Sequence, residues 1–176
     1  MMEPQRWESY CCLLAIGLLG CGSKNADAVA GSESLGASER LPTIVLHAGF
    51  RPDPVSFDGQ AVAKIPASDF HKRCKGFVSE TPNLVIETKT AFQKLHVFAR
   101  SAVDSVLVVR KPNGEILCAD DSDKDHNPMV YSSFGAGKAE VFVGNKKQGE
   151  TLAFTVGVSE VHWKPSSVAL PVSKAP

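Results

Sequence analysis

The sequence predicts an all-β fold, an antiparallel β-sandwich of the jelly-roll or immunoglobulin-like kind. Three observations predict it. Apolar residues alternate with period two in several short runs, turn-forming residues separate those runs, and almost no stretch has the 3.6-residue period of an amphipathic helix. Roughly seven to nine short strands fit the pattern.

Each strand is predicted from an alternating or continuous apolar run. In chain order, weaker candidates come first, at Thr43–His47, Gln60–Ile65 and Cys74–Val78. Alternation predicts strands at residues 83–88, 94–99, 138–143 and, most clearly, 151–159. Residues 105–110 are a nearly unbroken apolar run, which predicts a central strand covered on both faces. The residues expected to face the core are Leu84, Ile86, Leu95, Val97, Val141, Val143, Leu152, Phe154, Val156 and Val158.

Two connections carry turn chemistry. Lys111-Pro112-Asn113-Gly114 lies between two apolar runs, where proline presets a turn φ and glycine accepts a positive one. This connection predicts a β-hairpin. Residues 144–149 begin and end with glycine and are predicted to join the last two strands in the same manner.

The first twenty-one residues predict a lipid anchor. Cys11–Gly20 is an apolar run of ten residues, which spans only about 15 Å of helix and is therefore the hydrophobic region of a signal peptide rather than a membrane span. It ends in Leu18-Leu19-Gly20-Cys21, which resembles the bacterial lipobox, where the cysteine receives a diacylglycerol before cleavage in front of it. An ordinary secretory signal, with Cys21 incidental, is the alternative.

The chain is accordingly divided into four segments: a signal peptide at 1–20, a lipidated cysteine and flexible tether at 21–40, the sandwich domain at 41–162 and a proline-rich tail at 163–176. The tether is small and polar, so it can bury little surface. Three prolines in the tail cannot donate to a strand ladder, which predicts an extended or frayed end.

The lipobox resemblance also implies a location and a partner. Acyl chains on Cys21 would hold the protein at a membrane of the cell envelope, and Gly22 after the cysteine favours the outer membrane of a Gram-negative bacterium. A protein or polysaccharide partner is left unidentified. Nucleic acid is not expected as a partner, because 19 basic residues balance 19 acidic ones and no Lys/Arg cluster compensates locally.

Two cysteines are left for a disulfide. Cys11 and Cys12 leave with the signal peptide and Cys21 is acylated, so Cys74 and Cys118 remain, and an oxidising compartment suggests that they form one bridge. The bridge would close a loop of about 45 residues and stabilise the fold by roughly 4 kcal/mol at most. Two buried free thiols are the alternative. A zinc site is not expected, because no third and fourth ligand lies at a suitable spacing.

From Cys74 onward the order of signals resembles the bacterial pre-peptidase C-terminal (PPC) domain, a jelly-roll β-sandwich found on secreted proteases and alone in exported proteins. The segments that carry the resemblance cover about 110 residues and are Cys74–Val78, Pro82-Asn83, Asp104–Val109, Pro112-Asn113-Gly114, Cys118–Ser122, Asn127-Pro128 and Val141–Gly144. Upstream, Gly49–Pro54 is similar to stand-alone exported relatives. The resemblance implies the sandwich fold and, in some members of the family, a bound calcium ion.

An acidic run follows the predicted hairpin. Neighbouring carboxylates repel one another unless solvent, backbone N–H groups or a cation neutralises them, and Ca²⁺ prefers such oxygen ligands. The candidate calcium ligands are Asp104, Asp120, Asp121, Asp123, Asp125 and Asn127. The run is not an EF-hand, because His126 and Ser132 stand at its sixth and twelfth positions. The alternative is an Asx-rich turn without metal, and no other cofactor is expected.

No catalytic motif is visible: the chain has no Gly-x-Ser-x-Gly, no His-Glu-x-x-His and no Cys-x-x-Cys. Tyr131 and Trp163 are too few for an aromatic sugar-binding platform. The sequence therefore predicts a membrane-anchored lipoprotein that is not an enzyme and presents a binding or structural module. The alternatives are a calcium-binding accessory module of an exported peptidase or other hydrolase, and an enzyme whose triad is assembled only in three dimensions.

Overall fold

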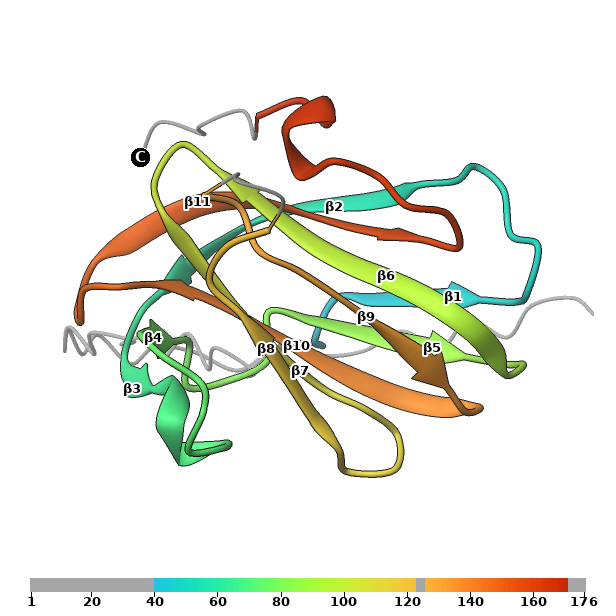
Figure 1. Ribbon diagram of the computed structural model, residues 1–176, viewed down its shortest axis with the longest axis horizontal. Helices are drawn as coiled ribbons and strands as arrows, with labels where there is room; N and C mark the ends of the chain where they lie inside the picture. Colours follow the sequence, from blue (N-terminus) through green and yellow to red (C-terminus); the bar gives the residue numbers. More distant parts are fainter. Residues whose placement is uncertain (1–39, 123–125, 171–176) are drawn as a thin grey trace, which may run out of the picture. The chain divides into compact units, whose positions relative to one another are not determined.

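The computed structural model describes residues 40–122 and 126–170. They form two β-sheets that lie face to face (Figure 1), which confirms the all-β sandwich. Two 3₁₀ turns, η1 (Ala67–Asp69) and η2 (Pro165–Ser167), are the helical elements of this part of the chain. No helix among the described residues has the length and apolar character needed to cross a membrane.

The eleven strands are β1 (Thr43–Leu46), β2 (Val55–Val62), β3 (Ile65–Pro66), β4 (Phe77–Val78), β5 (Leu84–Thr88), β6 (Phe92–Ser101), β7 (Ser105–Arg110), β8 (Ile116–Ala119), β9 (Met129–Phe134), β10 (Gly137–Asn145) and β11 (Thr151–Ser159), counted over the described ranges. Strands β7 and β11 have the predicted bounds. The predicted strand at Gln60–Ile65 is wrong, because the chain leaves β2 at Val62 and enters the other sheet at Ile65.

The larger sheet is built around β10. Glu140 of this strand pairs with both Val85 and Arg110, so β5 and β7 lie on its two edges. Gly144, further along β10, pairs with both Val78 and Val106, so β4 continues the row that β5 occupies. Beyond β7 lies β8, beyond β5 lies β1, and beyond β4 lies β3.

The smaller sheet has the order β2-β11-β6-β9, and all of its pairs are antiparallel. The core lies between the two sheets. Every residue that the alternation predicted to face inward lies in it, which confirms those assignments: Leu84, Ile86, Leu95, Val97, Val141, Val143, Leu152, Phe154, Val156 and Val158.

A second, smaller cluster covers the outer face of the larger sheet. It consists of Ala67, Cys74, Val78, Val106, Val108 and Phe142. Residues 65–78 form its cover, and the Phe70 ring lies 4.6 Å from the Phe142 ring between centroids. Leu107 and Val109 face the main core while Val106 and Val108 face this second cluster, so β7 is covered on both sides, as predicted.

Three predictions of the topology are corrected. The 111–114 turn does join the hairpin β7–β8, but residues 144–149 do not close a hairpin, because β10 and β11 belong to different sheets. The sandwich is not wholly antiparallel, since β1 runs parallel to β5. The tail is not extended throughout: Pro165 is buried in η2, and Arg100 on β6 donates to the Ser166 carbonyl.

Candidate functional site

The structure tests only part of the predicted site. Cys21, Asp123 and Asp125 lie outside the described residues. Cys74 and Cys118 form the predicted disulfide, with their Cα atoms 5.6 Å apart. The bridge is confirmed, and it fastens the 65–78 cover to β8.

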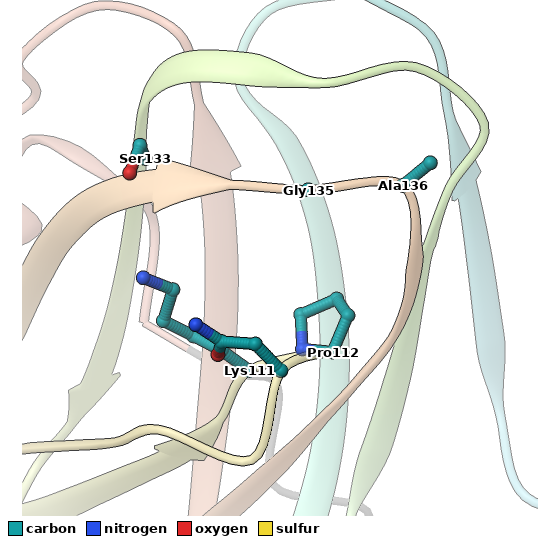
Figure 2. Close-up of a pocket in the computed structure, with 6 residues that line it drawn as sticks. Lys111, Pro112, Ser133, Gly135 and Ala136 are labelled. Atoms are coloured by element: carbon teal, nitrogen blue, oxygen red, sulfur yellow. The ribbon is translucent and has the colours of Figure 1, made fainter.

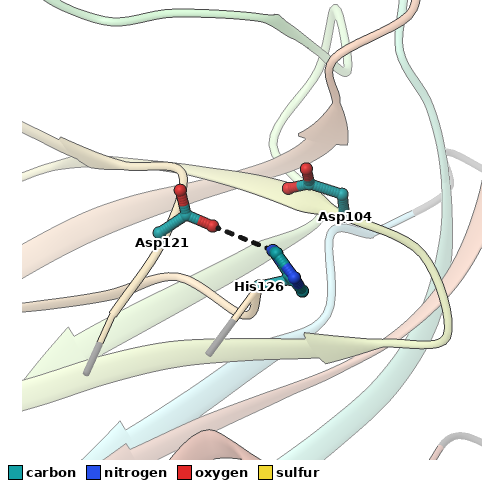
Figure 3. Close-up of side chains that lie close together, drawn as sticks. All are labelled: Asp104, Asp121 and His126. Carbon is teal, nitrogen blue, oxygen red and sulfur yellow. Dashed lines mark ion pairs between the residues drawn. The ribbon is translucent and has the colours of Figure 1, made fainter. Parts of the chain in front are cut away.

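The structure brings two of the predicted acidic residues together. Asp104, in the turn before β7, and Asp121, just after β8, meet His126, with one ligand atom of each within 4.8 Å of the others (Figure 3). Asp121 Oδ1 lies 3.6 Å from His126 Nδ1. Asn127 Oδ1 accepts a hydrogen bond from the Ser101 backbone N–H at 2.9 Å.

A lysine that sequence reasoning did not consider lies beside this cluster and offsets part of its negative charge. Lys146 Nζ lies 2.8 Å from Asp104 Oδ2 and 3.9 Å from Asp121 Oδ2. The hydrogen bond with Asp104 raises the pKa of Lys146, and the charges of Asp104, Asp121 and Asp120 act in the same direction. An ammonium group therefore lies beside two of the carboxylates that were predicted to hold a calcium ion. The Asx-turn alternative stays a prediction, because residues 123–125 lie outside the described residues.

We expect added calcium to leave the thermal stability unchanged, because Lys146 already compensates Asp104 and Asp121. A specific site would add about 2.7 kcal/mol to the free energy of unfolding at a hundredfold excess over Kd. Melting curves with millimolar CaCl₂, MgCl₂ or EDTA measure this directly. A rise of several degrees in calcium alone would contradict the expectation and restore the metal interpretation.

A cavity of about 270 Å³ lies between the 111–114 turn and the turn after β9 (Figure 2). Lys111 lines it, and its side chain is only 5% exposed. Its ammonium group donates to Glu115 Oε2 at 2.7 Å and to Ser132 Oγ at 3.0 Å. The Lys111 hydrogen bond lowers the pKa of the Glu115 carboxyl. Because the Lys111 ammonium group contacts Glu115 within the hairpin and Ser132 on β9, it fastens the β7–β8 hairpin to β9.

His96 is a buried histidine on the outer face of the smaller sheet. It is 2% exposed, and neither ring nitrogen has a hydrogen-bond partner. The rings of Tyr131 and His162 lie 5.5 Å and 5.7 Å from it between centroids. Burial lowers the pKa of His96, and the charges of Lys94 and His162 act in the same direction; the Ser159 backbone and the Asp53 carboxylate act against it.

The lowered pKa of His96 predicts a loss of stability in acid. The unfolded chain binds a proton at His96 near pH 6.5 while the folded chain does not. The free energy of unfolding therefore has its full value above about pH 6.5 and decreases as the pH falls further. We expect urea unfolding between pH 7.5 and 5 to show a slope of up to about 1.4 kcal/mol per pH unit from this group. His96→Phe should flatten the slope, and His47→Gln, at an exposed position, should not. An unchanged slope in His96→Phe would contradict the assignment.

The described residues also include a cleft that the sequence analysis missed. It has a volume of about 420 Å³, and its lining residues are His71, Arg73, Ile116, Leu117, Cys118, Met129, Val130 and Tyr131. The prediction that the chain has no local Lys/Arg cluster is wrong for residues 71–75. This segment reads His71-Lys72-Arg73-Cys74-Lys75 and places four basic side chains, one of them a histidine, within five residues. The run can be read in the sequence, but the net charge of the whole chain, which is zero, does not reveal it.

Four of the five histidines in the described residues show no contact of the kind a catalytic triad needs. His47, His71, His96 and His126 have no hydrogen bond to a serine or threonine hydroxyl within this part of the chain. The two described cysteines are joined to each other. A nucleophile held against a base, the geometric mark of such enzymes, is therefore not formed by these four histidines.

No family model and no curated protein matches this chain. The solved structures that match include PliG of Aeromonas hydrophila, a periplasmic inhibitor of g-type lysozyme, with 13% sequence identity. The match covers 68% of this chain and 98% of that chain, with a TM-score of 0.33. At that TM-score the likeness carries no argument about the function of this protein.

Proposed function

We propose that this protein is a non-catalytic, lipid-anchored lipoprotein of the cell envelope that presents its β-sandwich as a binding or structural module. The observation that carries the proposal is the Leu18-Leu19-Gly20-Cys21 sequence directly after an apolar run of ten residues. Lipid on Cys21 would keep the domain at a membrane, since two acyl chains suffice for stable anchoring.

The disulfide supports the proposed location. Disulfides persist in exported proteins and are rare where thiols are kept reduced. Cys74 and Cys118 are bridged, and the bridge holds a separate hydrophobic cluster together. Gly22 next to the anchoring cysteine supports the outer membrane as the finer part of this proposal.

The proposal includes a PPC-like origin for the domain, supported by the sandwich architecture and by the hairpin at Pro112-Asn113-Gly114. It does not include the calcium-dependent accessory role. Lys146 supplies the positive charge at Asp104 and Asp121, so the described residues favour the domain without a metal.

Metabolic labelling with radioactive palmitate tests the proposal. We expect the full chain to incorporate the label and to partition with membranes, and Cys21→Ser to lose both properties. Cys12→Ser is the matched control, because it removes a cysteine from the apolar run and leaves the lipobox intact. Label that persists in Cys21→Ser, or is absent from the wild-type chain, would overturn the lipid anchor.

A further inference from the structure

Strand β8 is an edge strand of the larger sheet, as are β1 and β3. Strand β8 pairs with β7 along one side and with no other strand among the described residues. All four of its residues are partly exposed. An unpaired edge offers a row of backbone N–H and C=O groups at the spacing of a strand. The cleft of about 420 Å³ lies along this edge, between β8 and the start of β9.

The two faces of β8 differ in what surrounds them. Leu117 and Ala119 lie against the main core, whereas Ile116 and Cys118 lie against the second cluster on the outer face. A strand added beside β8 would continue this alternation. Its inward side chains would meet the apolar residue Val130 of β9, which lies in the main core, and its outward side chains would meet the 65–78 cover, which contributes His71 and Arg73.

The cover carries exposed basic side chains, of which Arg73 lines the cleft and Lys72 does not. Lys72, Arg73 and Lys75 are exposed, and none forms an ion pair with another described residue. Asp69 is the one carboxylate within residues 69–75. The disulfide between Cys74 and Cys118 ties this basic segment directly to β8, so its position relative to the open edge is fixed by a covalent bond.

We infer that the β8 edge and its cleft bind an extended acidic peptide segment of a partner protein by adding it as a further strand of the larger sheet. The ligand alternates apolar residues, which face Val130, with Asp or Glu, which face His71 and Arg73. Four residues of β8 define a recognised length of about 13 Å. This inference specifies the binding surface of the proposed module. It rests on the proposed function only for the binding role, because it does not require the lipid.

Two features favour a peptide over an acidic polysaccharide. The N–H and C=O groups of a strand edge are matched by another extended peptide backbone, which has donors and acceptors at the same spacing. A sugar chain has no N–H and C=O groups at that spacing. The alternation of an apolar and a basic side of the cleft also matches the period of two in a β-strand. A polysaccharide is therefore an outcome that the test must exclude.

The test uses a blocked ten-residue peptide that alternates valine and glutamate, with a fluorescent label, and the full chain in detergent. Fluorescence anisotropy should show saturable binding that weakens with added salt. We expect Arg73→Glu to weaken binding by at least tenfold. Lys72→Glu is the matched control: it makes the same charge change in the same loop outside the cleft lining, and should weaken binding by less than threefold.

Hydrogen exchange gives the second readout. Amides of residues 116–119 should gain protection when the peptide is bound. Absence of saturable binding, an equal loss in Lys72→Glu and Arg73→Glu, or unchanged exchange in β8 would each overturn the inference. Tighter binding of an alternating valine–lysine peptide, or full competition by polygalacturonate, would overturn it as well. None of these results affects the palmitate experiment, so the failure of one proposal is distinguishable from the failure of the other.

Discussion

Gly144→Ala is expected to lower the free energy of unfolding by about 3 kcal/mol, the upper end of the usual cost of overpacking. Gly144 pairs with strands on both edges of β10, and a Cβ atom at this position would lie 1.9 Å from the Phe77 carbonyl oxygen and 2.6 Å from the Val78 Cα. Both atoms belong to backbone, which cannot rotate out of the way. The short strand β4 must therefore separate from β10, and the second cluster loses Val78 with it.

Gly135→Ala provides the matched control. Gly135 lies in the exposed turn after β9, and an added Cβ there has no neighbour within 4 Å. We expect this variant to remain within about 0.5 kcal/mol of the wild type, as is usual for surface substitutions. Urea unfolding followed by circular dichroism measures both variants. Equal stability of Gly144→Ala and Gly135→Ala would show that β4 moves without cost and would contradict the packing described for it.

The double substitution Cys74→Ser with Cys118→Ser is expected to cost about 2–5 kcal/mol, the usual loss when a native disulfide is removed from a small domain. The bridge spans a sequence separation of 44 residues and fixes the 65–78 cover on β8. Without it the cover is held mainly by the Phe70–Phe142 ring contact and by the short pairing of β4 with β10. We therefore expect the cover to open before the rest of the sandwich.

Reductant supplies the control for this pair of substitutions. Wild-type protein in dithiothreitol should melt like the double variant, and the double variant should not respond to reductant. Limited proteolysis should cut first within residues 67–76 in both reduced forms. If the oxidised and reduced wild-type proteins melt together, the bridge does not stabilise the cover and the account of the second cluster is wrong.

Local pattern predicted the bounds of two strands and missed others, since residues 55–59 of β2 and all of β9 were not predicted. β7 and β11 were placed with the correct ends because six and nine residues of regular burial leave little ambiguity. β3 and β4 have two residues each, which is too short for any period to appear. The parallel partner of β1 left no local trace, because the direction of pairing depends on where the chain returns and not on composition.

Turn chemistry predicted where the chain changes direction but not which sheet it enters next. The 111–114 turn closed a hairpin as expected, whereas residues 144–149, with similar residues, carry the chain from one sheet to the other. The candidate site shows the same limit. Asp104 and Asp121 were grouped correctly, but Lys146 is distant in sequence and its place between them depends on the fold.

The pairing of β2 with β11 has a consequence for the synthesis of the chain. The partners Asp58 and Thr155, whose side chains are hydrogen-bonded at 2.6 Å, are 97 residues apart. The edge strand β2 of the smaller sheet therefore has no partner strand until β11, near the end of the domain, has left the ribosome. Contacts of such large sequence separation form slowly.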